Sequence, residues 1–269
     1  MSKLFVKNVK IKSAFLKGFW ASFASFRLMR KNKSIVLFYI IPFLLNIILL
    51  SILIFLALTN IAPLLREFLA GDAWYLKLLN ALITPILFLF LIYIATVVYG
   101  FVGNILCSPF LDTLSQKTQE IVSGKKIDDS YPLKQFPKRF KDNLARTFAN
   151  FFKMLALLLA IYILSLFLLL IPLAGPILYS AIGYITASFI LGLQFLDYSL
   201  ERRQYTFGEK LKIAWKFKYS TIGLGASFLI VSMIPVLGFL GINMCVMGAS
   251  TIYERNIASA LLEHDANES

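Results

Sequence analysis

The chain has 269 residues, of which 59% are hydrophobic and 15% charged, and its formal net charge is +13. Soluble domains are about half apolar and about one-quarter charged, so this composition excludes an ordinary soluble enzyme and indicates a protein solvated largely by lipid. Four uncharged stretches each exceed the roughly 20 apolar residues that cross a hydrocarbon core. They are residues 34–65, 78–111, 154–196 and 219–253. Backbone that faces lipid must pair within its own segment, so we predict an all-α integral membrane protein with one membrane domain, residues 1–269.

The chain begins with a basic segment, residues 1–33, that contains nine Lys or Arg and no acidic residue. Within it, Phe15, Phe19 and Phe23 recur every four residues, which is the spacing of one helix face. We therefore expect an amphipathic helix that lies in the membrane interface.

Residues 34–111 are predicted to form two long transmembrane helices joined by a loop near Gly71. Pro42 and Pro85 lie inside the two apolar runs. A proline removes a backbone hydrogen bond from a helix, so we expect kinks at these positions.

Two further basic segments, residues 112–153 and 199–218, precede the last two apolar runs. Apolar residues recur about every four positions in each segment, with cations between them, which predicts interfacial helices that turn aromatic faces toward acyl chains and cations toward phosphates. The alternative is that these helices pack on one another as a cytoplasmic subdomain. The periodic residues are Phe136, Phe140, Leu144, Phe148 and Phe152 in the first segment and Phe207, Leu211 and Trp215 in the second.

The last two apolar runs are predicted to be helical hairpins, residues 154–198 and 219–253, because proline and glycine interrupt each run. The arms of the second hairpin contain roughly 15 residues, or about 22 Å of helix, so it is expected to penetrate only part of the bilayer. The first hairpin has the length either to span or to penetrate in part. An acidic tail, residues 254–269, ends the chain. The interrupting residues are Pro172, Gly175 and Pro176 in the first hairpin and Pro235 and Gly238 in the second.

The charge distribution predicts the orientation. Basic segments stay on the cytoplasmic side, so both termini are expected inside and Gly71 outside, in a single or a dual orientation. Because the cations flank apolar runs, they are expected to contact anionic membrane lipids, and no nucleic-acid partner is expected.

Catalytic chemistry is disfavoured by what the apolar runs lack. They carry no ionisable acid, base or histidine, and His264, the only histidine, lies in the tail. Cys107 and Cys245 lie inside apolar runs without a Cys/His cluster. We therefore expect that the protein is not an enzyme and that it has neither a metal site nor a cofactor.

Cations gather where the first transmembrane helix begins. Arg30, Lys31 and Lys33 precede Ser34, which is a candidate N-cap of that helix. Free N–H groups and the positive end of the helix dipole favour an oxyanion such as sulfate or phosphate at this point. The alternative is that these cations only contact lipid phosphate.

Three stretches resemble the CysZ-type sulfate permeases and their eukaryotic etoposide-induced relatives. Residues 104–112 are similar to the family's N-x-x-(A/S)-(A/S)-P-F element, and residues 197–207 to its D-Y-P-h-x-R-R-x-x-x-F element, with Ser199 in place of proline. Residues 225–250 contain the M-I-P and G-A-S landmarks. The residues that carry this resemblance are Asn104, Pro109, Phe110, Asp197, Tyr198, Arg202, Arg203, Pro235 and Gly248.

The resemblance implies two long spanning helices, two pairs of partly penetrating helices, homo-oligomers, and sulfate uptake that feeds cysteine biosynthesis. It also implies an anion site at the family's P-x-(L/I)-R-R element, which corresponds here to residues 33–37 and lacks both arginines. Lys31 and Lys33 offer point charges without the bidentate fork of arginine. Arg202 and Arg203 are a second candidate contact for the anion or for lipid head groups.

The interpretation is therefore a multi-pass permease of the bacterial inner membrane for sulfate or another small oxyanion, which works without ATP. The rival interpretation is a non-transporting membrane scaffold that binds anionic lipid or a partner protein. An enzyme that acts on lipid is a third alternative, and the absence of catalytic groups disfavours it.

Overall fold

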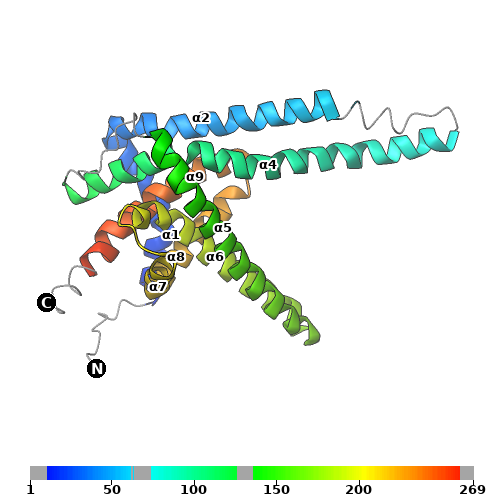
Figure 1. Ribbon diagram of the computed structural model, residues 1–269. Helices are drawn as coiled ribbons and strands as arrows, with labels where there is room; N and C mark the ends of the chain where they lie inside the picture. Colours follow the sequence, from blue (N-terminus) through cyan, green and yellow to red (C-terminus); the bar gives the residue numbers. More distant parts are fainter. Residues whose placement is uncertain (1–10, 62, 64–73, 126–135, 261–269) are drawn as a thin grey trace. The chain divides into compact units, whose positions relative to one another are not determined.

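The computed structural model describes residues 11–61, 63, 74–125 and 136–260, and every regular element in these ranges is a helix (Figure 1). Within these ranges, three helical segments are long and apolar enough to cross a membrane: Ile35–Ile61, Phe152–Leu170 and Ala174–Glu201. The predicted all-α membrane fold is thus confirmed. The chain forms two compact units, of which unit 1 contains Met1–Val36 and Asp112–Ser269 and unit 2 contains Leu37–Leu111.

Unit 2 is built from two antiparallel helices. Helix α2 (Lys33–Leu56) continues into a π-helical turn, η1 (Ala57–Ile61), and α4 (Trp74–Ser123) returns beside it (Figure 1). Both helices remain continuous through their internal prolines. Buried polar contacts join the two helices, because the Asn46 side-chain oxygen accepts hydrogen bonds from the Tyr99 hydroxyl at 2.5 Å and from the Cys107 thiol at 3.3 Å.

Helix α4 is 50 residues long, so it continues well beyond the apolar run that ends at Leu111. Its last three turns belong to unit 1 and bury one face, which carries Leu114, Ser115 and Thr118. The basic segment expected from residue 112 onward therefore begins as core helix. Polar helix formers such as Gln, Lys and Glu extend a helix as well as Leu does, so the end of the apolar run did not mark the end of the helix.

Helix α5 (Phe136–Leu166) is also continuous across the boundary expected at residue 153, and joins the predicted interfacial stretch to the first arm of a hairpin. The 3₁₀ turn η3 (Phe167–Leu170) precedes the hairpin tip, where Leu173 has φ 63°, and α6 (Ala174–Glu201) returns. The predicted break is confirmed. The apolar arms contain 19 and 28 residues, so their length suffices for a full crossing.

The second hairpin contains α8 (Lys218–Ser232) and α9 (Pro235–Ile252), followed by a π-helical turn, η4 (Tyr253–Ala258). It breaks at the predicted Pro235, which is the first residue of α9. The arms of 15 and 18 residues are about 22 and 27 Å long, so they are shorter than those of the first hairpin.

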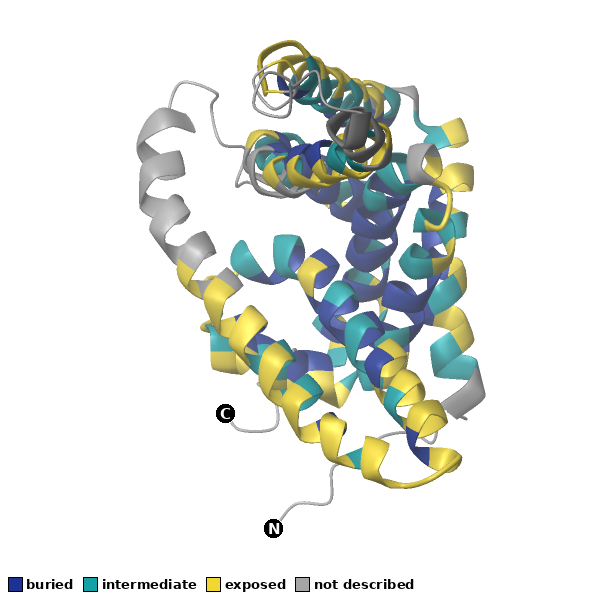
Figure 2. Cartoon of the chain, turned by 90° about the vertical axis from the view of Figure 1, so that its right-hand side faces the viewer, coloured by how far each residue is buried: buried dark blue, intermediate teal, exposed yellow. Residues whose placement is uncertain are grey.

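Close backbone contacts hold the core of unit 1 together. Helix α1 (Ile11–Lys31) packs on α8 and α9, and α6 packs on α8. A Cβ on Gly18 would overlap the Ser220 carbonyl oxygen, and a Cβ on Gly225 would overlap that of Ser188. Small residues allow this approach where lipid provides no hydrophobic force between helices. The buried residues of this core are dark blue in Figure 2.

Helix α1 packs on α8 and α9 through a face that lies beside the predicted aromatic stripe. The buried face contains small residues, Ala21, Ser22 and Ser25, and the Ser22 hydroxyl bonds to that of Ser227 at 2.8 Å. The phenylalanines flank this face and are half-buried. Small residues occupy the interface because they allow the backbone of α1 to approach those of α8 and α9 closely.

Helix α7 (Phe207–Lys216) begins with a capping box between Thr206 and Glu209. Its predicted apolar stripe divides, because Phe207 and Leu211 pack partly against the core while Trp215 is 61% exposed. Ala214 joins a buried cluster with Met154, Phe189, Ile190 and Leu193 of α5 and α6. The alternative of packing against neighbouring helices therefore applies to most of α7.

Candidate functional site

A buried ion pair joins the end of α6 to α4. Arg202, which follows α6, has a side chain only 4% exposed, and its Nη1 lies 2.6 Å from Oδ1 of Asp112. The same nitrogen donates to the Asp112 carbonyl oxygen at 2.9 Å, and Nη2 donates to the Ser115 hydroxyl at 2.5 Å. Three acceptors on one turn of α4 thus hold the guanidinium in place.

Serine hydroxyls extend this contact to a third helix. Oγ of Ser115 lies 2.8 Å from that of Ser250 on α9 and 3.3 Å from that of Ser199 on α6. All three serines are buried. The structure therefore brings together the three family-like stretches, residues 104–112, 197–207 and 225–250.

A second buried cation lies beside this network. Lys210 of α7 has a side chain 2% exposed, and its Nζ lies 2.6 Å from Oδ1 of Asp197 and also contacts the Glu201 carboxylate. Burial acts to lower the pKa of Lys210, but the two carboxylates outweigh it and raise the pKa above its usual value. Lys210 is therefore charged, and it pins α7 to α6.

The buried cations of this region are already paired with carboxylates, which limits what the region can bind. Arg202 is committed to Asp112, and Lys210 to two carboxylates. Arg203, by contrast, is exposed on the turn after α6. Of the two arginines proposed as a second anion contact, Arg203 is the one whose surroundings leave its charge accessible, while Arg202 joins helices.

The cations predicted to bind an anion lie where α1 gives way to α2. Arg30 and Lys31 are exposed in the last turn of α1, and neither forms an ion pair with any residue that the structure describes. Helix α2 begins at Lys33, so Ser34 lies inside the first turn and Asn32 occupies the capping position between the helices. The side chains of Lys33 and Ser34 fall outside the described residues.

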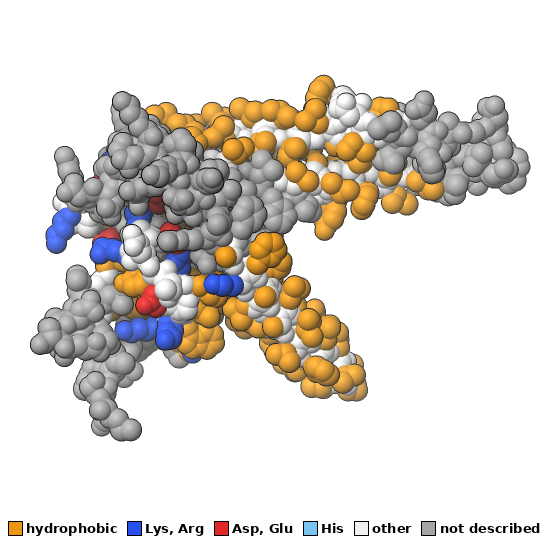
Figure 3. Space-filling model, viewed as in Figure 1, with side chains coloured by type: hydrophobic (Ala, Val, Ile, Leu, Met, Phe, Trp, Pro, Cys, Tyr) orange, Lys and Arg blue, Asp and Glu red, His pale blue; other side chains and the backbone are white. Residues whose placement is uncertain are grey.

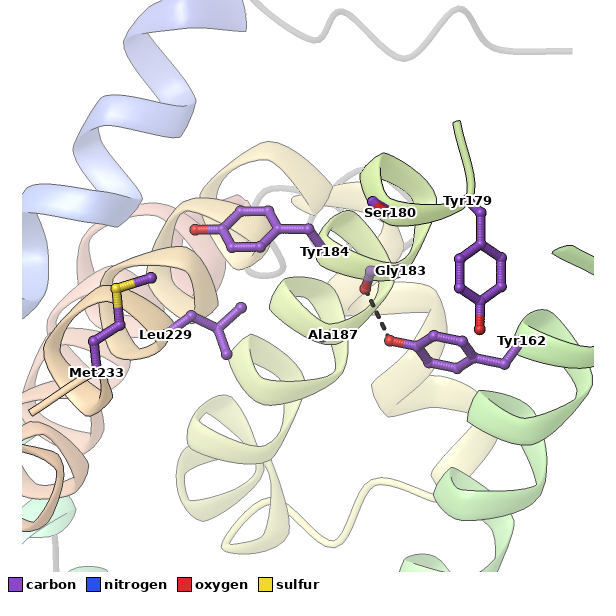
Figure 4. A pocket seen from close by; sticks show the side chains of 8 residues that line it. All are labelled: Tyr162, Tyr179, Ser180, Gly183, Tyr184, Ala187, Leu229 and Met233. Carbon is purple, nitrogen blue, oxygen red and sulfur yellow. Dashed lines mark hydrogen bonds between the residues drawn. The ribbon is translucent and has the colours of Figure 1, made fainter. Parts of the chain in front are cut away.

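A surface cavity of about 450 Å³ lies among α5, α6 and α8 (Figure 4). In the wall of this cavity, the Tyr162 hydroxyl donates a hydrogen bond to the Gly183 carbonyl oxygen at 3.3 Å. No charged residue is found among its described lining residues, so it offers nothing to neutralise a sulfate. The lining residues are Tyr162, Tyr179, Ser180, Gly183, Tyr184, Ala187, Leu229 and Met233.

The other family-like residues that the structure describes lie in helix packing. Pro109 and Phe110 are half-buried in α4, and Tyr198 is half-buried in α6. A Cβ on Gly248 would come within 2.8 Å of the Ser22 backbone nitrogen, so this glycine allows α1 to approach α9. The side chain of Asn104 falls outside the described residues.

Sequence reasoning missed the partners that complete the network. Ser115 and Lys210 were not singled out, although each had a signal. Ser115 follows Asp112 by three residues and so shares its helix face. The signal for Lys210 was its pair of partners, since Glu201 follows Asp197 by four residues and the two carboxylates therefore lie on one helix face.

Comparisons with known proteins agree with the resemblance. A family described as sulfate transporter CysZ/etoposide-induced protein 2.4 matches residues 21–242. The chain is 24% identical over 222 residues to a sulfate transporter CysZ of Vibrio atlanticus (strain LGP32), with 82% of this chain and 86% of that protein covered. It is 25% identical over 217 residues to the one of Vibrio parahaemolyticus serotype O3:K6, with 80% and 85% covered. It is 22% identical over 230 residues to the one of Pectobacterium atrosepticum, with 83% and 81% covered.

Proposed function

The chain belongs to the sulfate transporter CysZ/etoposide-induced protein 2.4 family, and from this premise we propose that it is a permease for sulfate or another small oxyanion in the bacterial inner membrane. The observation that carries the proposal is the similarity to bacterial proteins named sulfate transporter CysZ over four-fifths of this chain and of theirs. Three helical segments with the length and apolarity of membrane spans support it. Transport by such a permease would supply sulfate for cysteine biosynthesis.

The proposed anion site is the junction between α1 and α2. Exposed Arg30 and Lys31 lie beside the amino terminus of α2, whose first turn contains Lys33 and Ser34. A helix of 24 residues presents the positive end of its dipole at this point, although its Ile35 N–H already donates to the Asn32 carbonyl oxygen. The cations lack the forked geometry of the family's arginines, so we propose a weaker and less selective oxyanion site, with Arg203 as a second contact.

The remaining features of the proposal concern the setting of the permease. We propose that both termini are cytoplasmic, that the chain forms homo-oligomers, and that its basic segments contact anionic lipids. It is proposed to have no enzymatic activity, because the polar networks of unit 1 consist of ion pairs and hydroxyls that join helices.

Thermal unfolding of the purified protein tests sulfate binding. At a sulfate concentration of about 100 times Kd, binding stabilises the folded state by about 2.7 kcal/mol, so the midpoint should rise by roughly 5 °C or more and saturate. Chloride at equal ionic strength should not reproduce the rise, because general screening acts on all surface cations alike. Lys31→Gln with Lys33→Gln should abolish the sulfate effect.

A matched variant, Lys125→Gln with Arg255→Gln, removes two exposed charges elsewhere and should retain the sulfate effect. In cells without their own sulfate uptake, the wild-type chain should restore growth on limiting sulfate and the Lys31/Lys33 variant should do so poorly. Rescue that ignores these lysines but needs Arg203 would move the site to the turn after α6. Absence of both rescue and a sulfate-specific shift in the wild type would leave the scaffold interpretation.

A further inference from the structure

Lysines gather around Trp215 on the outer face of α7: Lys212 and Lys216 are exposed, and Lys218, at the start of α8, is half-buried. Lys212, Trp215 and Lys216 lie at positions i, i+3 and i+4, so they share a helix face opposite the buried Lys210. Nζ of Lys218 lies 5.0 Å from the centre of the Trp215 ring. We call these three lysines and Trp215 the α7 patch.

The lysines of the α7 patch outnumber the acidic groups near them. None of its lysines forms an ion pair with a described residue, whereas Lys210 on the opposite face contacts two carboxylates. Glu209 is the only acidic residue of α7, and its carboxylate accepts hydrogen bonds from the Thr206 backbone N–H and hydroxyl at the start of the helix. Glu209 also interacts electrostatically with Lys212, so three patch lysines face one carboxylate and the outer face of α7 carries a net positive charge.

The position of α7 along α6 places this patch at the base of the apolar arm. Lys210 contacts Asp197 near the end of α6, while Trp215 packs edge-on against Phe189 with ring centres 5.7 Å apart. Helix α7 therefore runs back along α6 from its charged end toward its apolar part. From Ala174 at the hairpin tip to Phe189, α6 extends about 24 Å, which is most of a hydrocarbon core.

The α5–α6 arm changes from charged to uncharged at the level of the α7 patch. Lys153 is the second residue of the Phe152–Leu170 span, and its Nζ is 5.9 Å from the centre of the Phe207 ring at the start of α7. Beyond it, residues 154–196 contain no charged side chain. In Figure 3 the projecting arm is covered by hydrophobic side chains, and Lys and Arg gather at its other end, around α7. Trp and Lys at such a boundary are the residues that membrane interfaces favour.

We propose that the α7 patch, with Lys153, is a binding surface for the head groups of anionic phospholipids at the plane where the α5–α6 arm enters the bilayer. Charge complementarity carries the assignment, because head-group phosphates supply the negative charge that the protein does not provide. The indole of Trp215 lies at the level of the glycerol backbone, half in contact with acyl chains. This surface specifies the lipid contact proposed above for the basic segments, and it is distinct from the α1–α2 junction and does not depend on sulfate transport.

The test uses the fluorescence of Trp215 in the full-length chain reconstituted into bilayers. Trp20→Phe and Trp74→Phe leave Trp215 as the only tryptophan. Lipids brominated near the head group should quench it more than lipids brominated near the chain end. At equal mole fraction, brominated phosphatidylglycerol should quench with an apparent association at least about fivefold stronger than brominated phosphatidylcholine, which is roughly the factor that one cation contributes at an anionic surface.

Lysine variants identify the source of this preference. Substitution of the three patch lysines by Gln should bring the preference for phosphatidylglycerol close to unity, whereas substitution by Arg should retain it, because charge alone is required. A charge-matched control, Arg27→Gln with Lys125→Gln and Arg255→Gln, should also retain the preference. An unchanged helical circular dichroism spectrum identifies variants that remain folded.

Three results would overturn the proposal. Quenching of Trp215 by aqueous iodide without quenching by any brominated lipid would place the patch in water. Protection from both iodide and lipid would mean that another protein surface covers it. Equal quenching by the two lipids, unchanged when the lysines become Gln, would reduce the contact to acyl chains without recognition of head groups.

Discussion

Removal of the Asp112 carboxylate tests the buried contact between α4 and the end of α6. Asp112→Asn would leave the Arg202 guanidinium, whose side chain is 4% exposed, without its counter-charge. Breaking a fully buried ion pair costs about 3–5 kcal/mol, and an exposed pair contributes about 0–1 kcal/mol. Because Asp112 is itself 33% exposed and Ser115 remains as an acceptor, we expect a loss of about 2–3 kcal/mol. The thermal midpoint in detergent, followed by circular dichroism, should fall by roughly 5–10 °C.

An ion pair within one turn of the same helix, less buried on its cationic side, provides the control. Lys117 and Glu120 lie 2.9 Å apart, with side chains 39% and 15% exposed, and Lys117→Ala should cost less than about 0.5 kcal/mol. Asp112→Asn combined with Arg202→Gln should cost less than the sum of the single changes, because the double variant buries no unpaired charge. The reasoning is refuted if Asp112→Asn costs no more than Lys117→Ala or if the two single costs add.

Other positions allow equally direct tests. Gly225→Ala should destabilise the protein by roughly 1–3 kcal/mol in chemical unfolding, since its Cβ would overlap backbone, whereas Gly208→Ala has open space and should be neutral or stabilising. Hydrogen bonds from the Thr206 backbone and hydroxyl lower the pKa of Glu209, so their contribution to α7 is present above pH 4.5 and is lost as the pH falls through the lowered pKa. Hydrogen exchange should show α7 loosening over that range, and Thr206→Ala should lower its protection about fivefold at neutral pH. A cysteine at Gly71 should react with an impermeant maleimide from outside the cell, and reaction only from inside would reverse the orientation.

Hydropathy and turn chemistry predicted the helices and their breaks, but not where the helices end. Proline and glycine located both hairpin tips, because these residues cannot continue a helix whatever surrounds them. The ends of α4 and α5 were missed because hydropathy reports where lipid ends, and a helix can continue into water or into a protein core. The continuation of α4 after Asp112 is polar by sequence and buried in the structure.

The buried network was accessible to sequence reasoning only in part. The family-like stretches identified Asp197 and Arg202 as notable residues, but the pairing of Arg202 with Asp112 joins positions 90 residues apart in sequence. A single sequence contains no signal for that distance. The burial of Lys210 was also hidden, because a lysine among other lysines on a short amphipathic helix is usually exposed.

The glycine contacts among α1, α6, α8 and α9 bear on how unit 1 responds to a change of surroundings. In a bilayer, the packing of apolar side chains on one another contributes little hydrophobic free energy, because lipid tails solvate these side chains as well as a protein core does. Contacts between backbones depend instead on shape and on dispersion forces, which differ little between bilayer and detergent. Unit 1 is therefore expected to keep its helix packing during solubilisation, so that its architecture does not depend on its solvent.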